Sequence, residues 1–488
     1  MTDQREAIRS NAKYLRNVRP IDPEEICDYV EGSPHPAVVR QHLREDAVSL
    51  GLLEREDGTF VPVGDEPVSP RRGPVEGFPD RYGDRLEDLL VDRYGVDWHR
   101  DGTGQLLRST IRRFKSRYLE GRPVEYDDDV AAGYAIYHLP GYYAAVQYAL
   151  DDLAERGLLD RELRVLDVGA GVGGPVLGLC DYLPDDAVLE YHAIEPSAAA
   201  DVLDGLLEET GRNVHPTIHR EPVEDVDLDS IGDGEGFDLV LACNVLSELA
   251  DAEAVARSAL EALKPDGTLL GMAPADKNTS IELRALERDL EGTTIDPSSA
   301  GDGSASEVTV YGPTVRLWPG ATPTDRGWSF DARPDLAVPS FQRQLDEATP
   351  EDDADHAPGE FVNVDVQFSY SLLRLDGKRR IEIDLETSDW AKMAETERHV
   401  TNRVDLAAAK LSRSLSAEDA NPLFKISDGS ETVDHYAVLT RESSLNRPLL
   451  EADYGEVLTF EGILVLWNDD EGAYNLVVDE ETIVDRIG

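Results

Sequence analysis

The stretch that decides the fold is "RVLDVGAGVGGP", residues 164–175. Its first five residues have the apolar pattern of a buried strand, and the glycines that follow allow a tight turn and a close approach of the backbone to a ligand. A helix beginning after them would offer free amides to a negative group. Gly169, Gly171 and Gly173 fit one spacing of nucleotide-cofactor loops, whereas Gly169, Gly171 and Gly174 fit another. The loop alone therefore predicts a cofactor site without deciding the cofactor.

Strand-like and helix-like segments alternate through the following hundred residues. This order predicts an α/β fold with a doubly wound parallel sheet, in which ligands bind at the carboxyl ends of the strands. The expected strands are 164–168, 189–195, 215–221, 237–246 and 267–274, and the expected helices are 174–183, 196–211 and 251–265. A Pro-Asp-Gly turn is expected at 265–267, before the fifth strand.

Two acidic residues favour S-adenosylmethionine over a dinucleotide. Asp167 precedes Gly169 by two residues, where dinucleotide loops usually have an apolar residue, and it could receive the ligand's ammonium directly or through water. Glu195 ends the second strand, where a carboxylate can accept both ribose hydroxyls. With the Pro-Asp-Gly turn, these features resemble the class I S-adenosylmethionine-dependent methyltransferases. The resemblance places Asp167, Gly169, Gly171 and Gly173 on the family's first motif and Glu195 on its ribose-binding acid.

Further residues are weaker candidates for the cofactor site. Glu221, after the third strand, could read the adenine amino group, with a surface acid as the alternative. In "ACNVLSEL" (242–249), Asn244 and Glu248 could lie near the sulfonium. This segment lacks the Asn/Asp-Pro-Pro-aromatic signature of many base-amino methyltransferases, and Cys243 is typical of packing on a buried strand. Methyl transfer can proceed by in-line positioning alone, so the sequence predicts no catalytic base.

Five stretches, in order, are similar to the small-ribosomal-subunit methyltransferase-like family, whose mitochondrial members include methyltransferase-like protein seventeen. They are "YAIYHLPGYYAAVQYALDDL" (134–153), "VLDVGAGVGG" (165–174), "LVLACNVLSEL" (239–249), "WSFDARPDLAVPSF" (328–341) and "VQFSYSLLRL" (366–375). The resemblance covers about residues 126–376. It implies a methyltransferase-like domain that acts on ribosomal RNA or helps to assemble the small subunit.

Members of that family typically hold an iron-sulfur cluster through cysteines. The corresponding segment here, "VYGPTVRLWPGATPTDRGWSF" (310–330), contains no cysteine. In "FKISDGS" (424–430), Ser427 stands where a family-like Cys-Asp-Gly would be expected. Because thiolates are needed for such clusters, we expect no iron-sulfur cluster and no other metal.

The flanks predict two further domains around the domain at 126–376. Residues 1–64 read as a winged-helix-like module, with a helix capped by Asp22, a longer helix capped by Ser33 and ending at Gly51, and a hairpin at Asp57. Its second helix could enter a nucleic-acid groove, and protein docking is an equal alternative. Residues 377–488 are β-rich and suggest a small barrel, similar to an OB-fold. The barrel could bind RNA through aromatic residues or be purely structural.

Between these domains, residues 65–125 are expected to form a linker and one basic helix. The helix, "QLLRSTIRRFKSRY" (105–118), is the most basic stretch of the chain. Its candidate RNA contacts are Arg108, Arg112, Arg113, Lys115 and Arg117. The alternative is a solvated face that pairs with neighbouring acids.

The overall charge points to the surroundings of the protein. The chain has 488 residues, of which 99 are acidic and 47 are Lys or Arg, giving a net charge of −52. Such self-repulsion is screened in concentrated salt, which predicts the cytoplasm of a halophile. The three cysteines are too few for a disulfide framework, and "MTDQREAIRS" has no apolar core of a signal peptide. We therefore expect a cytoplasmic protein with no membrane contact.

Together, these features predict an S-adenosylmethionine-binding protein that works on ribosomal RNA or on the assembly of the small ribosomal subunit. One alternative is a non-catalytic assembly factor that uses the pocket structurally or as a sensor. Another is a methyltransferase for a small molecule or a protein. The sequence predicts no oligomeric state.

Overall fold

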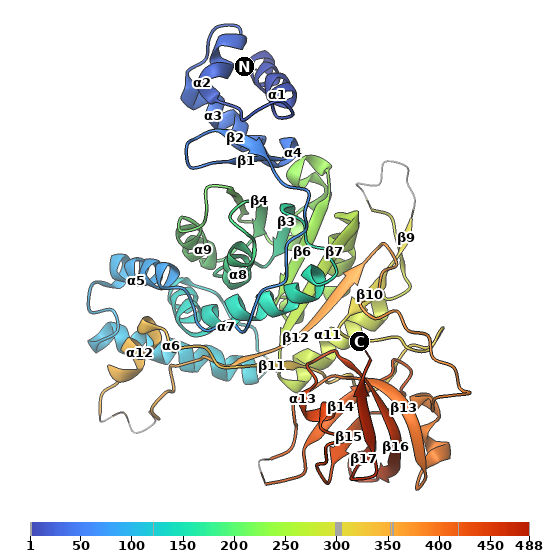
Figure 1. Ribbon diagram of the computed structural model, residues 1–488. Helices are drawn as coiled ribbons and strands as arrows, with labels where there is room; N and C mark the ends of the chain where they lie inside the picture. Colours follow the sequence, from blue (N-terminus) through green and yellow to red (C-terminus); the bar gives the residue numbers. More distant parts are fainter. Residues whose placement is uncertain are drawn as a thin grey trace. The chain divides into compact units, whose positions relative to one another are not determined.

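The chain divides into two compact units in a computed structural model that describes residues 2–120, 122–297, 305–351, 353, 356–417 and 419–487. The first unit comprises Met1–Leu241 and Pro334–Val366, and the second comprises Ala242–Arg333 and Gln367–Gly488. Figure 1 labels the helices and strands of both units. Each unit is described by itself below.

The N-terminal part of the first unit consists of four helices and a hairpin. They are α1 (Thr2–Leu15), α2 (Pro23–Tyr29), α3 (Pro36–Glu45), α4 (Ala47–Leu50), β1 (Leu52–Glu54) and β2 (Phe60–Pro62). Strands β1 and β2 pair antiparallel around the predicted turn. Buried apolar residues of the four helices and of the hairpin, Phe60 among them, form one core that holds these elements together. The winged-helix assignment of residues 1–64 stays a prediction.

Capping decides where the helices of this part begin and end. Asp22 caps α2, as predicted, because its carboxylate accepts a hydrogen bond from a backbone N–H of the first turn. The predicted cap at Ser33 is wrong. Ser33 has a φ of 41°, and the ring of His35 caps α3 instead, with Pro36 as the first helical residue. The predicted helix is divided into α3 and α4, and it ends at Gly51, with a φ of 58°, as expected.

The described residues of the first unit form six more helices. They are α5 (Asp80–Tyr94), α6 (Asp101–Leu119), α7 (Asp128–Ala154), α8 (Gly174–Tyr182), α9 (Ala199–Leu207) and α12 (Ser340–Glu347). α6 confirms the expected basic helix, whereas α5 lies where only a linker was expected. Tyr82, Leu86 and Leu90 explain α5, because a spacing of four places them on one face, which is buried in the same core as α7.

The sheet of the first unit is parallel. Its strands are β3 (Glu162–Val168), β4 (Val188–Ile194), β5 (Val214–His219) and β6 (Phe237–Cys243), with two 3₁₀ turns, η1 (Val223–Asp225) and η2 (Leu228–Gly234), before β6. β3 lies between β4 and β6, and β4 also pairs with β5. The register places Asp167 opposite Ala193 of β4 and Leu241 of β6. The strands confirm the predicted β-α-β order.

The complete sheet is mixed, because some of its strands pair antiparallel. Its strand order is β10-β12-β7-β6-β3-β4-β5, and β6 contributes its last two residues to the second unit. β12 (Val366–Arg374) is antiparallel to β7 (Leu263–Pro274) and to β10 (Thr309–Gly312), while β11 (Asp331–Arg333) also pairs with β12. The prediction of an α/β fold is confirmed, whereas that of a purely parallel sheet is wrong.

The Pro-Asp-Gly turn expected at 265–267 is also wrong. β7 begins at Leu263 and runs through these residues, with Pro265 and Asp266 exposed. An exposed strand position tolerates a proline, which has no N–H to donate. The remaining elements of this part are η3 (Leu246–Glu248), α10 (Ala252–Glu261), α11 (Lys277–Leu290), β8 (Thr294–Ile295) and β9 (Ser306–Glu307).

The C-terminal part of the second unit is a closed five-stranded barrel. Its strands follow the order β13-β14-β15-β17-β16, and pairing of β13 with β16 closes it, while β18 lies along β16. The elements are η4 (Met393–His399), β13 (Arg403–Lys410), β14 (Leu423–Ser427), β15 (His435–Leu439), α13 (Pro448–Glu451), β16 (Val457–Asn468), β17 (Ala473–Val478) and β18 (Ile483–Arg486). Among the aromatic residues of this part, through which the barrel could bind RNA, Tyr454, Phe460 and Tyr474 are buried, and Trp467 is exposed.

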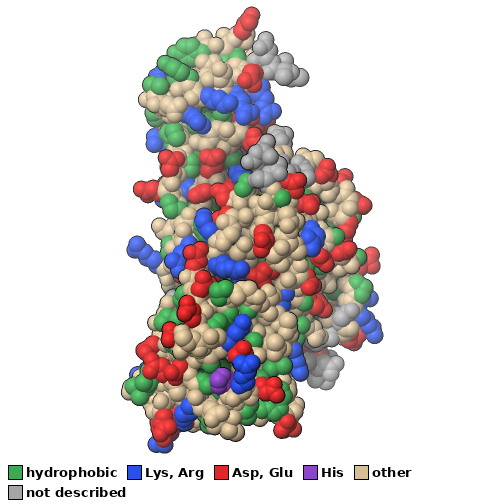
Figure 2. Space-filling view, turned by 90° about the vertical axis from the view of Figure 1, so that its right-hand side faces the viewer, with side chains coloured by type: hydrophobic (Ala, Val, Ile, Leu, Met, Phe, Trp, Pro, Cys, Tyr) green, Lys and Arg blue, Asp and Glu red, His purple; other side chains and the backbone are tan. Residues whose placement is uncertain are grey.

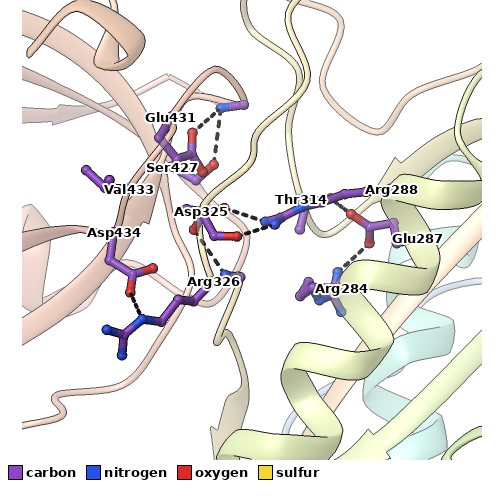
Figure 3. Close-up of polar contacts among 12 residues, drawn as sticks. Arg284, Glu287, Arg288, Thr314, Asp325, Arg326, Ser427, Glu431, Val433 and Asp434 are labelled. Atoms are coloured by element: carbon purple, nitrogen blue, oxygen red, sulfur yellow. Dashed lines mark hydrogen bonds and ion pairs between the residues drawn. The ribbon is translucent and has the colours of Figure 1, made fainter. Parts of the chain in front are cut away.

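A buried ionic cluster joins α11 to β14 within the second unit. Arg284 and Glu287 form an ion pair on α11, and Arg288 of the next turn reaches Asp325. Figure 3 shows these side chains pointing toward one another from α11 and from the segment at 314–326. Lys425 of β14 contacts both Asp325 and Asp434, the latter at 2.8 Å. Each of these buried charges therefore has an opposite charge beside it.

Acidic side chains are spread over the surface rather than gathered in one tail. Figure 2 shows Asp and Glu scattered over the face that it presents, with Lys and Arg between them. In the part of the chain that the structure describes, no helix is long and apolar enough to cross a membrane.

Candidate cofactor site

The glycine loop joins β3 to α8 in a conformation that requires glycine. Gly169, Gly171 and Gly173 have φ values of 65°, 57° and 91°, a region that other residues rarely adopt. The N–H of Gly169 donates to the carbonyl oxygen of Ile194 at 2.9 Å, which fastens the loop to the end of β4. A Cβ atom added to Gly173 would lie 2.6 Å from Leu203 Cδ1. The loop is therefore shaped by both its backbone and its neighbours.

Asp167 is buried at the start of this loop with half of its carboxylate unsatisfied. Its side chain is 1 % exposed, and its Oδ2 accepts a hydrogen bond from the Tyr191 hydroxyl at 2.8 Å. Its Oδ1 is buried and has no hydrogen-bond partner among the described residues. Burial raises the pKa of Asp167 to about 7, against the lowering effect of Tyr191, and the charge of Glu195 adds to the rise. Because an unpaired buried acceptor is unfavourable, this oxygen suits a donor from a ligand.

Glu195 ties the loop to the segment that follows β4. Its Oε2 accepts from the Gly171 N–H at 2.8 Å, and its Oε1 accepts from the Ser197 N–H at 2.9 Å. The side chain is 7 % exposed. A carboxylate has about four acceptor positions, so capacity remains for ligand hydroxyls. Glu195 thus holds the loop in shape and still fits the role of a ribose-binding acid.

The structure brings together five of the predicted cofactor residues, namely Asp167, Gly169, Gly171, Gly173 and Glu195. Glu221 is exposed after β5, a position that also fits the alternative of a surface acid. Asn244 belongs to the second unit, where it follows β6 with a φ of 60° and its N–H donates to Met272 O at 2.9 Å. The roles of Glu221 and Asn244 stay predictions.

The five basic residues of α6 have different surroundings. Arg108 is buried and donates to the carbonyl oxygens of His99 and Leu345. Arg112 forms a forked pair with Glu360 and also contacts Asp353. Both arginines therefore contact neighbouring elements, and the pairing of Arg112 with acids matches the alternative weighed for this helix.

The other three cations lie farther along α6. Lys115 donates to the Tyr137 hydroxyl at 2.8 Å, and Arg117 to the Pro123 carbonyl oxygen at 3.3 Å. Arg113 and Arg117 are exposed, and Lys115 is half-buried. An RNA-contact role for these residues stays a prediction, with Arg113 and Arg117 the most accessible of the five.

Tyr191 is a site residue that the sequence reasoning missed. It is fully buried on β4, beside Val165 of β3, and its hydroxyl bonds Asp167. A signal was available, because a tyrosine within an apolar buried strand needs a partner for its hydroxyl. The identity of that partner depends on the strand register, which the sequence does not reveal.

The described residues contain no group of three or more His, Cys, Asp or Glu side chains that could hold a metal ion. Among the described residues, Cys27, Cys180 and Cys243 form no disulfide bond. Ser427 ends β14, where its hydroxyl accepts a hydrogen bond from the Gly429 N–H at 3.1 Å.

A family comparison defines the class of this region. Residues 166–269 match the family model of a methyltransferase domain. The matched range begins in β3, contains the glycine loop and Glu195, and ends in β7. The chain therefore contains a methyltransferase domain at residues 166–269.

The flanks match models of a different kind. Residues 5–56 match the N-terminal domain, and residues 394–487 the C-terminal domain, of a domain of unknown function, DUF8157. The latter range covers the barrel. No curated protein matches the chain in sequence.

The solved structures similar to the chain include several methyltransferases. The mitomycin 7-O-methyltransferase MmcR is 18 % identical over 56 % of this chain and 76 % of its own, with a TM-score of 0.23. The sugar N-methyltransferase KedS8 from a Streptoalloteichus species is 22 % identical over 27 % and 47 %, with a TM-score of 0.20. The magnesium protoporphyrin IX methyltransferase ChlM from Synechocystis, with bound S-adenosylmethionine, is 15 % identical over 43 % and 87 %, with a TM-score of 0.25. Similarity at these scores says nothing about the substrate of this chain.

Proposed function

We propose that the chain is an S-adenosylmethionine-dependent methyltransferase that binds its cofactor at the glycine loop. The observation that carries the proposal is the buried Oδ1 of Asp167, which has no donor among the described residues although it lies beside a loop of glycines with positive φ. The cofactor's ammonium would supply that donor. Glu195 would accept the ribose hydroxyls, and the N-terminal amides of α8 would face the carboxylate.

When bound, S-adenosylmethionine supplies an activated methyl group for a nucleophile. The residues of the chain would bind and orient the cofactor, and in-line positioning of the acceptor can provide much of the acceleration. Binding of the cationic cofactor requires Asp167 to lose its proton. Because the pKa of this carboxyl is raised to about 7, affinity should rise as the pH increases through neutrality.

For the acceptor, we propose ribosomal RNA of the small subunit, or an assembly intermediate of that subunit. The ordered stretches similar to the small-ribosomal-subunit methyltransferase-like family support this proposal, as do the exposed Arg113 and Arg117 on α6. The barrel adds support if it is OB-like, and the N-terminal helices do so if they form a winged helix.

Calorimetry tests cofactor binding, and it should be done in molar KCl because of the net charge of −52. The parent should bind S-adenosylmethionine, and Asp167→Asn should bind it about 10- to 100-fold more weakly, since hydrogen bonds to charged groups contribute about 1.5–3 kcal/mol. Asp185→Asn, at an exposed aspartate, is the control and should bind like the parent. Equal binding by the parent and Asp167→Asn would refute the site.

Transfer is tested separately with methyl-labelled cofactor and immature small subunits. Incorporation of label into RNA supports catalysis on the proposed acceptor. Cofactor binding without incorporation would instead favour the two alternatives, a non-catalytic assembly factor or a methyltransferase for a small molecule or a protein.

A further inference from the structure

Tyr191 lies in the middle of β4, at a position where packing alone would accept a phenylalanine. The side chain is fully buried, and its register partner on β3 is Val165, two residues before Asp167. Because alternate residues of a strand lie on one face, Tyr191 and Asp167 project from the same face of the sheet. A buried hydroxyl is unfavourable unless it is hydrogen-bonded. The hydrogen bond from Tyr191 to Asp167 Oδ2, at 2.8 Å, therefore accounts for a tyrosine at this position.

This hydrogen bond distinguishes the two oxygens of Asp167. Oδ2 accepts from Tyr191, whereas Oδ1 is buried and has no hydrogen-bond partner among the described residues. The terminal torsion of an aspartate is broad, so an anchor on one oxygen fixes the direction of the other. The Tyr191 hydroxyl thus leaves Oδ1 as the oxygen that can receive a donor from a ligand.

The same hydrogen bond acts on the charge of Asp167. Burial favours the protonated acid, and the negative charge of Glu195 adds to this effect, so that the pKa of Asp167 is raised to about 7. The hydrogen bond from Tyr191 opposes both, because it stabilises the carboxylate. The residues paired with Asp167 in register, Ala193 of β4 and Leu241 of β6, are apolar and buried. Among the described residues, Tyr191 is therefore the group that favours the ionised form.

We propose that Tyr191 is a positioning residue of the cofactor site, whose hydroxyl keeps Asp167 ionised and directed toward the ammonium of the bound cofactor. The consequence is selectivity among ligands. Ligands that carry the ammonium are favoured over adenosine derivatives that lack it, and the size of this preference depends on Tyr191. The inference rests on the proposed function for the identity of the ligand, and it adds to that function a residue that sets ligand selectivity.

The test is calorimetry with S-adenosylhomocysteine in molar KCl at pH 5.5, 7 and 8.5. This ligand carries the amino and carboxylate groups of the cofactor without its reactive sulfonium. Below the pKa of Asp167, binding must first remove the proton, which is harder without the Tyr191 hydroxyl. Tyr191→Phe should therefore bind about 10- to 100-fold more weakly than the parent at pH 5.5, the usual effect of losing a hydrogen bond to a charged group. At pH 8.5 the gap should narrow to about fourfold or less, because most of the carboxylate is then ionised in both proteins.

Two controls accompany this measurement. Tyr182→Phe removes a hydroxyl that also donates to a carboxylate at 2.8 Å, that of Asp151, and it should bind like the parent at every pH. The second control is a ligand, 5′-methylthioadenosine, which has neither the amino nor the carboxylate group. Tyr191→Phe should bind it with parental affinity, which would show that the rest of the pocket is intact.

A measurement without ligand tests the effect of Tyr191 on Asp167 independently of the proposed function. In the cofactor-free protein, Tyr191→Phe should lose more stability at pH 8.5 than at pH 5.5, because only at the higher pH does the hydroxyl contact a charged oxygen. Urea denaturation in molar KCl measures this difference. In the Asp167→Asn background the difference between the two pH values should disappear, since the asparagine cannot titrate.

Two outcomes would overturn the inference although the parent binds S-adenosylhomocysteine. The first is a loss of affinity in Tyr191→Phe by the same factor at all three pH values, which would leave Tyr191 only a packing role. The second is an equal loss for 5′-methylthioadenosine, which would mean that the whole pocket is disturbed. Absence of binding of either ligand by the parent would instead refute the proposed function, so the two failures are told apart.

Discussion

Asp167 of the first unit and Asp325 of the second are both buried carboxylates, with 1 % and 7 % of their surface exposed, yet their surroundings are opposite. Asp325 accepts from Lys425, Arg288 and the N–H of Gly327. Asp167 accepts from the Tyr191 hydroxyl, its Oδ1 has no partner among the described residues, and no cation contacts it there. A buried charge with its partners in place stabilises one arrangement of the chain. A buried carboxylate without a neighbouring cation is suited to bind a ligand that carries a positive charge.

The pKa values of the two carboxyls follow this difference. Burial alone would raise the pKa of Asp325, but the charges of Lys425 and Arg288 outweigh burial and hold it below its ordinary value. Burial raises the pKa of Asp167 to about 7, and no cation among the described residues counteracts that rise. Perturbed acids that lie in a ligand loop are candidates for function, whereas those within an ion-pair cluster are structural.

The largest effect should come from breaking the ionic cluster. Lys425→Met would leave Asp325 and Asp434 buried without their shared cation, and removal of one partner of a buried pair typically costs about 3–5 kcal/mol. The free energy of unfolding, measured by urea denaturation in molar KCl, should fall by that amount. Because buried pairs are little screened, the loss should persist across KCl concentrations.

Lys378→Met provides the matched control, since Lys378 is half-exposed and pairs with Asp376. An exposed pair contributes at most about 1 kcal/mol. Similar losses of stability for Lys425→Met and Lys378→Met would show that the buried cluster stabilises the second unit no more than an exposed ion pair does.

The second largest effect should be a gain in the free energy of unfolding rather than a loss, and it should depend on pH. The folded-state pKa of Asp167 lies above that of an unfolded chain, so the folded protein keeps a proton that the unfolded chain has lost between about pH 4 and pH 7. Stability contributed by this group therefore falls as the pH rises through that window. Asp167→Asn cannot titrate, and it should make the cofactor-free protein more stable than the parent by about 1–3 kcal/mol at pH 8, and by less at pH 5.

Unfolding curves of the parent and Asp167→Asn at both pH values measure this difference. Asp185→Asn should show the same difference from the parent at pH 5 and pH 8. If Asp167→Asn were less stable than the parent at pH 8, the carboxylate would have a structural role like that of Asp325, and the contrast between the two regions would disappear.

Local features of the chain were predictable from sequence. The glycine loop, the strand β3 before it, the helix α8 after it and the Asp22 cap depend on residues within a few positions of one another. The Ser33 cap failed because Pro34 and Pro36 are both suitable first helical residues, so that the local signals fit either start. Helix α1 and helix α5 were not recognised either, because their apolar stripes are short and lie among many charged residues.

Contacts between distant segments were not predictable. The hydroxyl of Tyr191 reaches Asp167 because β3 and β4 pair in one register, and a shift of one residue would turn it to the other face. Arg112 meets Glu360 across 248 positions of the sequence. Likewise, Asp325 and Lys425 are ordinary surface residues by type, and only the fold makes them a buried pair.

The smallest effect tests whether the shape of the glycine loop, rather than Asp167 alone, separates the cofactor region from the ionic cluster. Gly173→Ala should cost about 1–2 kcal/mol, because a φ of 91° is unfavourable for alanine and its Cβ would press on the fully buried Leu203. Gly211→Ala is the control, since its φ is ordinary and nothing lies within 4 Å of an added Cβ, so stability should change by less than about 0.5 kcal/mol. Thermal unfolding of both variants measures the change in stability, and S-adenosylmethionine calorimetry measures the change in cofactor affinity.

If Gly173→Ala lowers stability but leaves cofactor affinity at the parental value, the loop is a structural turn like any other, and Asp167 and Glu195 alone define the site. A loss of affinity beyond the loss of stability would mean that the displaced loop no longer presents its amides and the Gly171 contact to Glu195, so that backbone shape and buried charge act as one unit.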